Sequence, residues 1–230
     1  MRELIYLPVI HEVPECHYLE LNEQEREDVD AFERDVLPGF WIMINRLVRD
    51  IHAKTPIHKV YGEGFFPDVN LEDVIAEGVQ QGRCMAQPAH YLISHGAAAM
   101  PTEHRALAYL SHKVEEIRLQ LNPIPMPDEL AERFDINQGL ELARLYLADN
   151  DYRVVGDLCR GETKFDVNRL RDKHIAQRIN ETLLDDEYGM LFLGAGHKAH
   201  EVLAYEVGEG IIVRREGNGF TEDILKMIRE

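Results

Sequence analysis

Short apolar runs alternate along this chain with longer stretches in which apolar residues recur at helical spacing. Residues 4–10 are apolar apart from Pro8, and the length of the run favours a buried strand over a helix. Because proline has no backbone N–H, we expect this strand to end or bulge at Pro8. Similar short runs predict strands at residues 58–62, 89–94 and 152–155, in the run that ends at Leu193, and at residues 211–215.

The longer stretches have apolar positions spaced as on one face of a helix. They predict helices at residues 22–53, 71–81, 102–121, 129–150 and 167–184. Pro38-Gly39 should kink or split the first helix, and Asn70 is suited to cap the second. Strands that alternate with helices are typical of an α/β fold. We therefore expect a single α/β domain over residues 1–230, with a mixed, mostly parallel central sheet flanked by helices.

Composition narrows the classes of partner. The chain of 230 residues carries a net charge of −17, which argues against nucleic acid as its main partner because phosphate binding needs a basic face. The apolar runs are all shorter than the roughly 20 residues that span a bilayer, so no membrane is expected. The three cysteines form no CxxC pair, which indicates free thiols in a reducing compartment. These features together favour a cytoplasmic protein.

Three polar residues follow predicted strands and are candidates for chemistry. His11 comes after the first strand, Glu63 after the second, and His197 after the strand that ends at Leu193. If these strands are parallel and adjacent, the three side chains emerge at one edge of the sheet, where α/β proteins bind ligands. Two imidazoles and a carboxylate can hold a divalent metal such as Mn, Co or Zn, which would lower the pKa of bound water. Without a metal, Glu63 could act as a general base with a histidine as its partner.

The C-terminal third carries a more specific pattern. Arg171-Asp172 opens a predicted helix, and about fifteen residues after that segment a strand runs into Gly194-Ala-Gly196-His197. This combination resembles the TraB/Tiki/erythromycin-esterase/ChaN-like superfamily, in which an Arg-Asp helix precedes a strand that ends in a GxxH motif. Members also have a GxxH after the first strand and an acidic residue after the second, the places of His11 and Glu63. The first motif departs from the pattern, because Pro8 stands where the family has glycine.

The resemblance implies hydrolysis of a small-molecule or peptide substrate, by an esterase-like or a metal-dependent peptidase-like reaction. It assigns His11, Glu63 and His197 to the reacting centre, and Arg171 to an anionic substrate group or to negative charge in the transition state. Asp172 is expected to orient a neighbour or to cap its helix. Some members bind haem or act without catalysis, so a non-catalytic ligand-binding protein of the same fold is an alternative.

A dinucleotide-binding loop is a further alternative. Gly194, Gly196 and Ala199 satisfy G-x-G-x-x-[G/A] between a strand and a helix, and Glu216 lies near the distance at which an acidic residue binds ribose. Few residues follow Glu216 to build the remaining strands of such a fold. The interpretation as a histidine site is therefore preferred.

Overall fold

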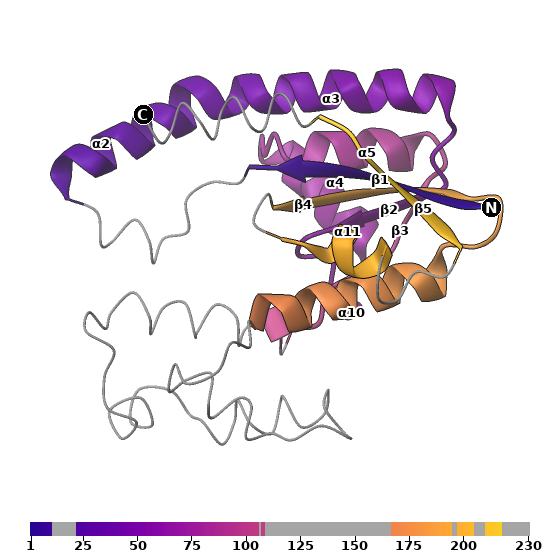
Figure 1. The fold of residues 1–230 in the computed structure, drawn as a ribbon. Helices are drawn as coiled ribbons and strands as arrows, with labels where there is room; N and C mark the ends of the chain where they lie inside the picture. The colour runs from indigo at the N-terminus through magenta and orange to yellow at the C-terminus, as the bar shows by residue number, and fades with distance from the viewer. Residues whose placement is uncertain (11–21, 106, 109–166, 195–196, 205–209, 218–230) are drawn as a thin grey trace, which may run out of the picture.

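In the part of the chain that the structure describes, five strands form one central sheet (Figure 1). The structure is a computed structural model and describes residues 1–10, 22–105, 107–108, 167–194, 197–204 and 210–217. The strands are β1 (Arg2–Val9), β2 (Lys59–Gly62), β3 (Ala98–Ala99), β4 (Tyr188–Gly194) and β5 (Ile211–Arg215). Their order across the sheet is β3-β2-β4-β1-β5, and each of these four pairings is parallel. The prediction of an α/β fold with a mostly parallel sheet is confirmed.

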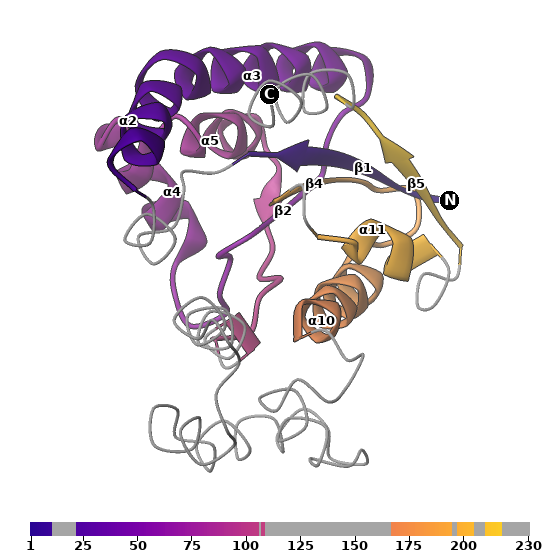
Figure 2. The same ribbon diagram turned by 60° about the vertical axis from the view of Figure 1, so that its left-hand side comes forward.

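Helices cover both faces of the sheet (Figure 2). One face is covered by α3 (Leu37–Lys54), α4 (Leu71–Gln80) and α5 (Ala86–Ser94), and the chain reaches α3 through α2 (Glu23–Ala31) and the π-helical turn η1 (Phe32–Val36). The other face is covered by α10 (Val167–Thr182) and the short α11 (Ala199–Val202). The split of the first helix close to Pro38 and the Asn70 cap, which accepts a hydrogen bond from the Glu72 N–H, are both confirmed.

The central strands β4 and β1 are mostly apolar because both of their faces are buried. Along β1, Ile5 and Leu7 pack with α3, α4 and α5, whereas Leu4 and Tyr6 point to the α10 side. The same alternation holds in β4, where Met190 and Phe192 belong to the first core and Leu191 and Leu193 to the second. Two apolar cores therefore hold the central strands β4 and β1 from opposite sides.

The expectation that the first strand ends or bulges at Pro8 is wrong. Strand β1 continues to Val9, and Pro8 pairs in register with Leu193 of β4. The carbonyl of Tyr6 accepts the N–H of Glu216 on the β5 side, so the backbone groups of Pro8, two residues on, point to that side as well. Pairing with β5 ends at Tyr6 and Arg215, so the missing N–H of Pro8 falls beyond that ladder.

The third predicted strand, at residues 89–94, is also wrong, because these residues form the end of α5. Pro88 lies in the first turn of this helix, where a missing N–H costs no helical hydrogen bond. The buried residues Pro88, Ala89 and Leu92 face the core at helical spacing. The true third strand is β3, only two residues long.

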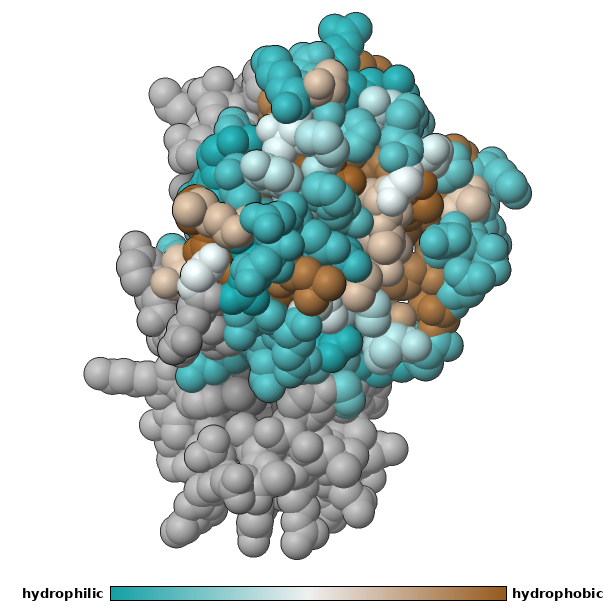
Figure 3. All heavy atoms as spheres, turned by 90° about the vertical axis from the view of Figure 1, so that its right-hand side faces the viewer, coloured by the Kyte–Doolittle hydropathy of each residue, from teal (hydrophilic) through white to brown (hydrophobic). Residues whose placement is uncertain are grey.

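Viewed from the amino ends of the strands, the described surface is mostly hydrophilic, with apolar areas between the polar groups (Figure 3). Large exposed apolar side chains come from separate stretches of the chain, such as Met1, Leu184 and Ile212. None of the helices in the described part of the chain is both long enough and apolar enough to cross a membrane.

Candidate functional site

The carboxyl ends of β2, β4 and β1 lie side by side, because β4 is inserted between the other two strands. Glu63 follows β2 directly, and its N–H donates to the carbonyl of Phe192 in β4. Gly194 ends β4, and its carbonyl accepts the N–H of His197 in a turn. The condition stated in the sequence analysis, that these strands lie parallel and side by side, is therefore met, and it brings Glu63 and His197 together.

The carboxylate of Glu63 is held between two strands and a helix. One oxygen, Oε2, accepts a hydrogen bond of 3.3 Å from the Gly194 N–H. The other, Oε1, accepts from Nη2 of Arg171 at 3.0 Å and lies 3.6 Å from Nε2 of His197. With 26% of its side chain exposed, Glu63 is the most accessible acid of the group.

A second, fully buried carboxylate holds Arg171 from the opposite side. Glu103 accepts from Nε of Arg171 at 3.1 Å and from Nη2 at 2.6 Å, a bidentate pair. Burial alone would lower the pKa of Arg171, but the carboxylates of Glu103 and Glu63 outweigh it and raise that pKa. The guanidinium is therefore a fixed positive charge that bridges the two acids.

Asp172, the next residue on α10, holds His197. Its Oδ1 lies 2.7 Å from Nδ1 of His197, and its Oδ2 accepts the N–H of Lys198 at 2.8 Å. The prediction that Asp172 orients a neighbour is confirmed. One carboxylate thus fixes both the imidazole and the turn that carries it, and leaves Nε2 facing Glu63 and Arg171.

The charges around His197 favour its protonated form. Burial alone would lower the pKa of His197, but its hydrogen bond to Asp172 and the nearby Glu63 carboxylate raise it to about 9. At neutral pH the ring is then an imidazolium whose Nε2 can donate a proton. When the ring is neutral, Nε2 can accept a hydrogen bond from Nη1 of Arg171, 3.4 Å away.

Glu103 was missed by sequence analysis. Residues 102–105 resembled the start of a helix with Thr102 as its cap, but the Thr102 hydroxyl donates to the carbonyl of Gly62 at 2.6 Å. The N–H of Glu103 binds the Phe65 carbonyl, so this segment is tied to the loop after β2. Glu63 was found because polar residues that follow a strand are site candidates. If β3 had been recognised in the sequence, Glu103 would have been found by the same rule.

Two predicted site residues, His11 and Gly196, lie outside the described residues, as do the predicted elements at residues 129–150 and 152–155. Arg171 does face the site, but the groups it binds in the structure are the protein's own carboxylates.

Part of the predicted metal site can be compared with the structure. Nε2 of His197 and Oε1 of Glu63 are 3.6 Å apart, close enough for both atoms to bind one metal, but Nη1 and Nη2 of Arg171 lie 3.4 and 3.0 Å from the same two atoms, so a metal there would have to displace the guanidinium. A carboxylate on Nδ1, as Asp172 provides, is also the usual support of a metal-binding histidine. Within the described residues no group of three potential ligands is present, and His11 lies outside them.

The geometry does not favour the dinucleotide alternative. The acidic residue that binds ribose should follow the strand next to the glycine loop. Here β1 separates β4 from β5, so Glu216 lies two strands away from Gly194. The Gly194 N–H is already bound to Glu63, and a pyrophosphate there would meet the negative charge of Asp172 as well.

Comparison with protein-family models, with curated proteins and with solved structures finds no match for this chain.

Proposed function

We propose that this protein is a hydrolase that cleaves an ester or amide bond at the carboxyl edge of the sheet. One observation carries the proposal: an accessible carboxylate, Glu63, lies 3.6 Å from Nε2 of a histidine that Asp172 holds by its other nitrogen. A base and an acid within one substrate's reach are what the addition of water to a carbonyl requires.

The roles follow from accessibility and charge. Glu63 takes a proton from a water molecule as the water oxygen attacks the carbonyl carbon of the substrate. The imidazolium of His197 hydrogen-bonds to the oxyanion that forms, and its Nε2 proton passes to the leaving group as the bond to carbon breaks. Water replaces the proton on His197, and Glu63 releases its proton to solvent, so the site is restored.

Arg171 acts in this scheme through its positive charge and its hydrogen bond to Glu63. Its Nη2 binds Glu63 Oε1, and its Nη1 lies 3.4 Å from Nε2 of His197, the atom that donates to the oxyanion in this scheme. Glu103 in turn fixes the guanidinium with two hydrogen bonds. Preorganised charge of this kind stabilises a transition state without reorganisation during the reaction.

A divalent metal is an alternative to this scheme, because an Nε2 that binds a metal carries no proton to donate. Glu63 and His197 would hold Mn, Co or Zn together with His11, and the metal would supply a more acidic bound water. The non-catalytic, haem-binding alternative has no observation among the described residues in its favour.

The test is hydrolysis of a panel of p-nitrophenyl esters and short peptides by the full chain. Glu63→Gln and His197→Gln should each lower kcat/KM by about 10²–10⁴, the usual worth of a general acid or base. Glu72→Gln is the matched control, because Glu72 is an exposed acid in the first turn of α4. It should leave the rate unchanged.

Unchanged rates in both site variants would refute the proposal. A chelator separates the metal from the rest of it. Activity that is lost on chelation and restored by Mn, Co or Zn supports the metal, whereas activity that resists chelation removes the metal and leaves the roles of Glu63 and His197 standing.

A further inference from the structure

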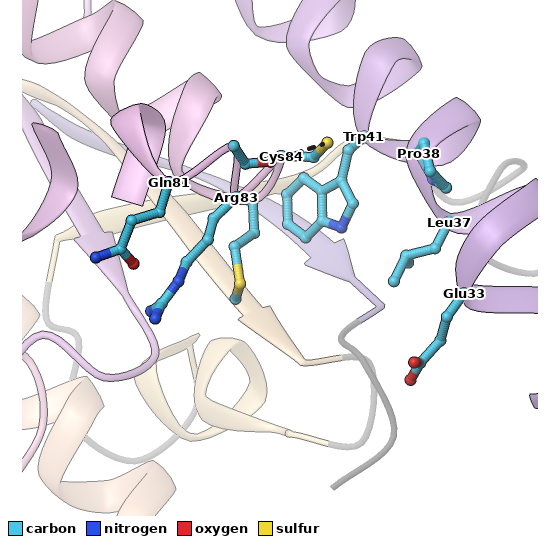
Figure 4. A pocket seen from close by; sticks show the side chains of 9 residues that line it. Glu33, Leu37, Pro38, Trp41, Gln81, Arg83 and Cys84 are labelled. Carbon is cyan, nitrogen blue, oxygen red and sulfur yellow. Dashed lines mark hydrogen bonds between the residues drawn. The ribbon is translucent and has the colours of Figure 1, made fainter. Parts of the chain in front are cut away.

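A pocket of about 210 Å³ lies between the start of α3 and the turn that joins α4 to α5 (Figure 4). Trp41, Leu37 and Pro38 line it from α3, and Arg83 and Cys84 line it from the turn. The C-terminal ends of α3 and α5 lead to the amino ends of β2 and β3, so the N-terminal ends of these helices lie at the opposite, carboxyl edge of the sheet. The pocket is therefore on the carboxyl side. An engineered apolar cavity of about 150 Å³ holds one benzene ring, so this pocket has room for a single ring with a short side chain.

Two donors at the pocket have no partner in the described part of the chain. Trp41 is only 5% exposed, yet its indole N–H makes no hydrogen bond to any described residue. The exposed guanidinium of Arg83 likewise forms no ion pair with a described carboxylate. The indole nitrogen of Trp41 is open to solvent, so a ligand oxygen can take the place of water as its hydrogen-bond acceptor.

The two ends of the pocket differ in charge. In Figure 4 the indole of Trp41 lies between the side chain of Arg83 on one side and that of Glu33 on the other. An anionic group is attracted to the guanidinium at the Arg83 end, so the pocket orients a ligand with one charged terminus. The apolar surfaces of Leu37 and Pro38 suit the uncharged remainder.

We propose that this pocket binds a small aromatic or aliphatic carboxylic acid, with its carboxylate on Arg83 and its apolar part against Trp41. The proposal goes beyond the hydrolytic function and does not depend on it, since none of the lining residues belongs to the Glu63 and His197 site.

Trp41 is the single tryptophan of the chain, so its fluorescence reports directly on the pocket. The probe is 3-phenylpropionate, with uncharged 3-phenylpropanol as its matched analogue. A ligand of about eleven non-hydrogen atoms should give a saturable change with a Kd on the order of 0.1–1 mM. The acid should bind about five times more tightly than the alcohol, the effect of one charged contact near the surface.

Arg83→Gln should remove this preference, and Arg46→Gln, which removes an exposed arginine of α3 outside the pocket, should preserve it. As an independent locator, the acid should slow alkylation of Cys84 at least about threefold, measured on the peptide by mass spectrometry. The proposal is overturned by the absence of a saturable change at about 10 mM acid, by equal binding of acid and alcohol, by equal losses in the two arginine variants, or by an unchanged Cys84 rate.

Discussion

Replacing Asp172 with asparagine tests how the site controls the charge of His197. The variant keeps the size of the side chain but removes the negative charge that lies 2.7 Å from Nδ1. In the native protein the pKa of His197 is raised from 6.5 to about 9. At ~1.36 kcal/mol per pKa unit, the folded state binds this proton more strongly than the unfolded chain by roughly 3 kcal/mol. Since Asp172 is the first of the raising contributions, Asp172→Asn should lower the proton affinity of His197 at least about tenfold.

The assay is an NMR titration of the imidazole C–H signals, with the His197 signal identified by its loss in His197→Gln. Stability gives a second readout. Because the folded pKa lies above the unfolded one, the contribution is complete below pH 6.5 and is lost as the pH rises through about 9. In urea unfolding, the free energy of unfolding of the native protein should fall as the pH rises from 6.5 through about 9. The free energy of unfolding of Asp172→Asn should fall less over the same pH range. A native His197 that titrates near 6.5, or one unaffected by Asp172→Asn, would refute the reasoning.

Three further predictions concern stability and are measured by urea unfolding. Arg171→Met leaves Glu103 buried without its cation and should cost about 3–5 kcal/mol of stability. The double variant Arg171→Met, Glu103→Gln removes the buried charge as well and should recover much of this loss. If the double variant recovers none of it, the unpaired charge is not the cause. Gly189→Ala places a Cβ 2.9 Å from the Tyr61 ring and should cost about 1–3 kcal/mol. Gly39 lies in α3, and a Cβ added there has no atom within 4 Å, so Gly39→Ala should be neutral or stabilise the protein by up to about 1 kcal/mol. Equal effects of Gly189→Ala and Gly39→Ala would contradict this reasoning. Asn70→Ala should cost about 1 kcal/mol, and Asn70→Ser, which keeps a capping oxygen, should cost far less. Equal losses in the two variants would exclude capping.

Much of the fold could be predicted from the sequence because its central strands are buried on both faces. Such strands are nearly continuous apolar runs, which identified β1 and β4. Shorter apolar runs beside polar residues identified β2 and β5. The same rule failed at residues 89–94, because a six-residue apolar run fits a buried helix as well as a strand. Strand β3 has only two residues, Ala98 and Ala99, and a pattern cannot be recognised over so short a segment.

The site was predictable only where its residues follow recognised strands. Glu63 and His197 were found in this way, and Asp172 was expected to orient a neighbour. The partner of Arg171 was not found, because Glu103 follows the strand that was missed and is fixed by tertiary contacts with the loop after β2. The error at Pro8 has a similar origin, since a lost N–H matters only where a neighbouring strand would have accepted it.

The pH dependence of kcat/KM for ester hydrolysis tests most directly whether Glu63 and His197 act as base and acid. If the His197 imidazolium donates the proton, the rate should fall as the pH rises through about 9, and this fall should move to lower pH in Asp172→Asn. A rate that stays level or rises between pH 8 and 10, or a falling limb that Asp172→Asn leaves in place, would contradict the assignment of His197 as the acid.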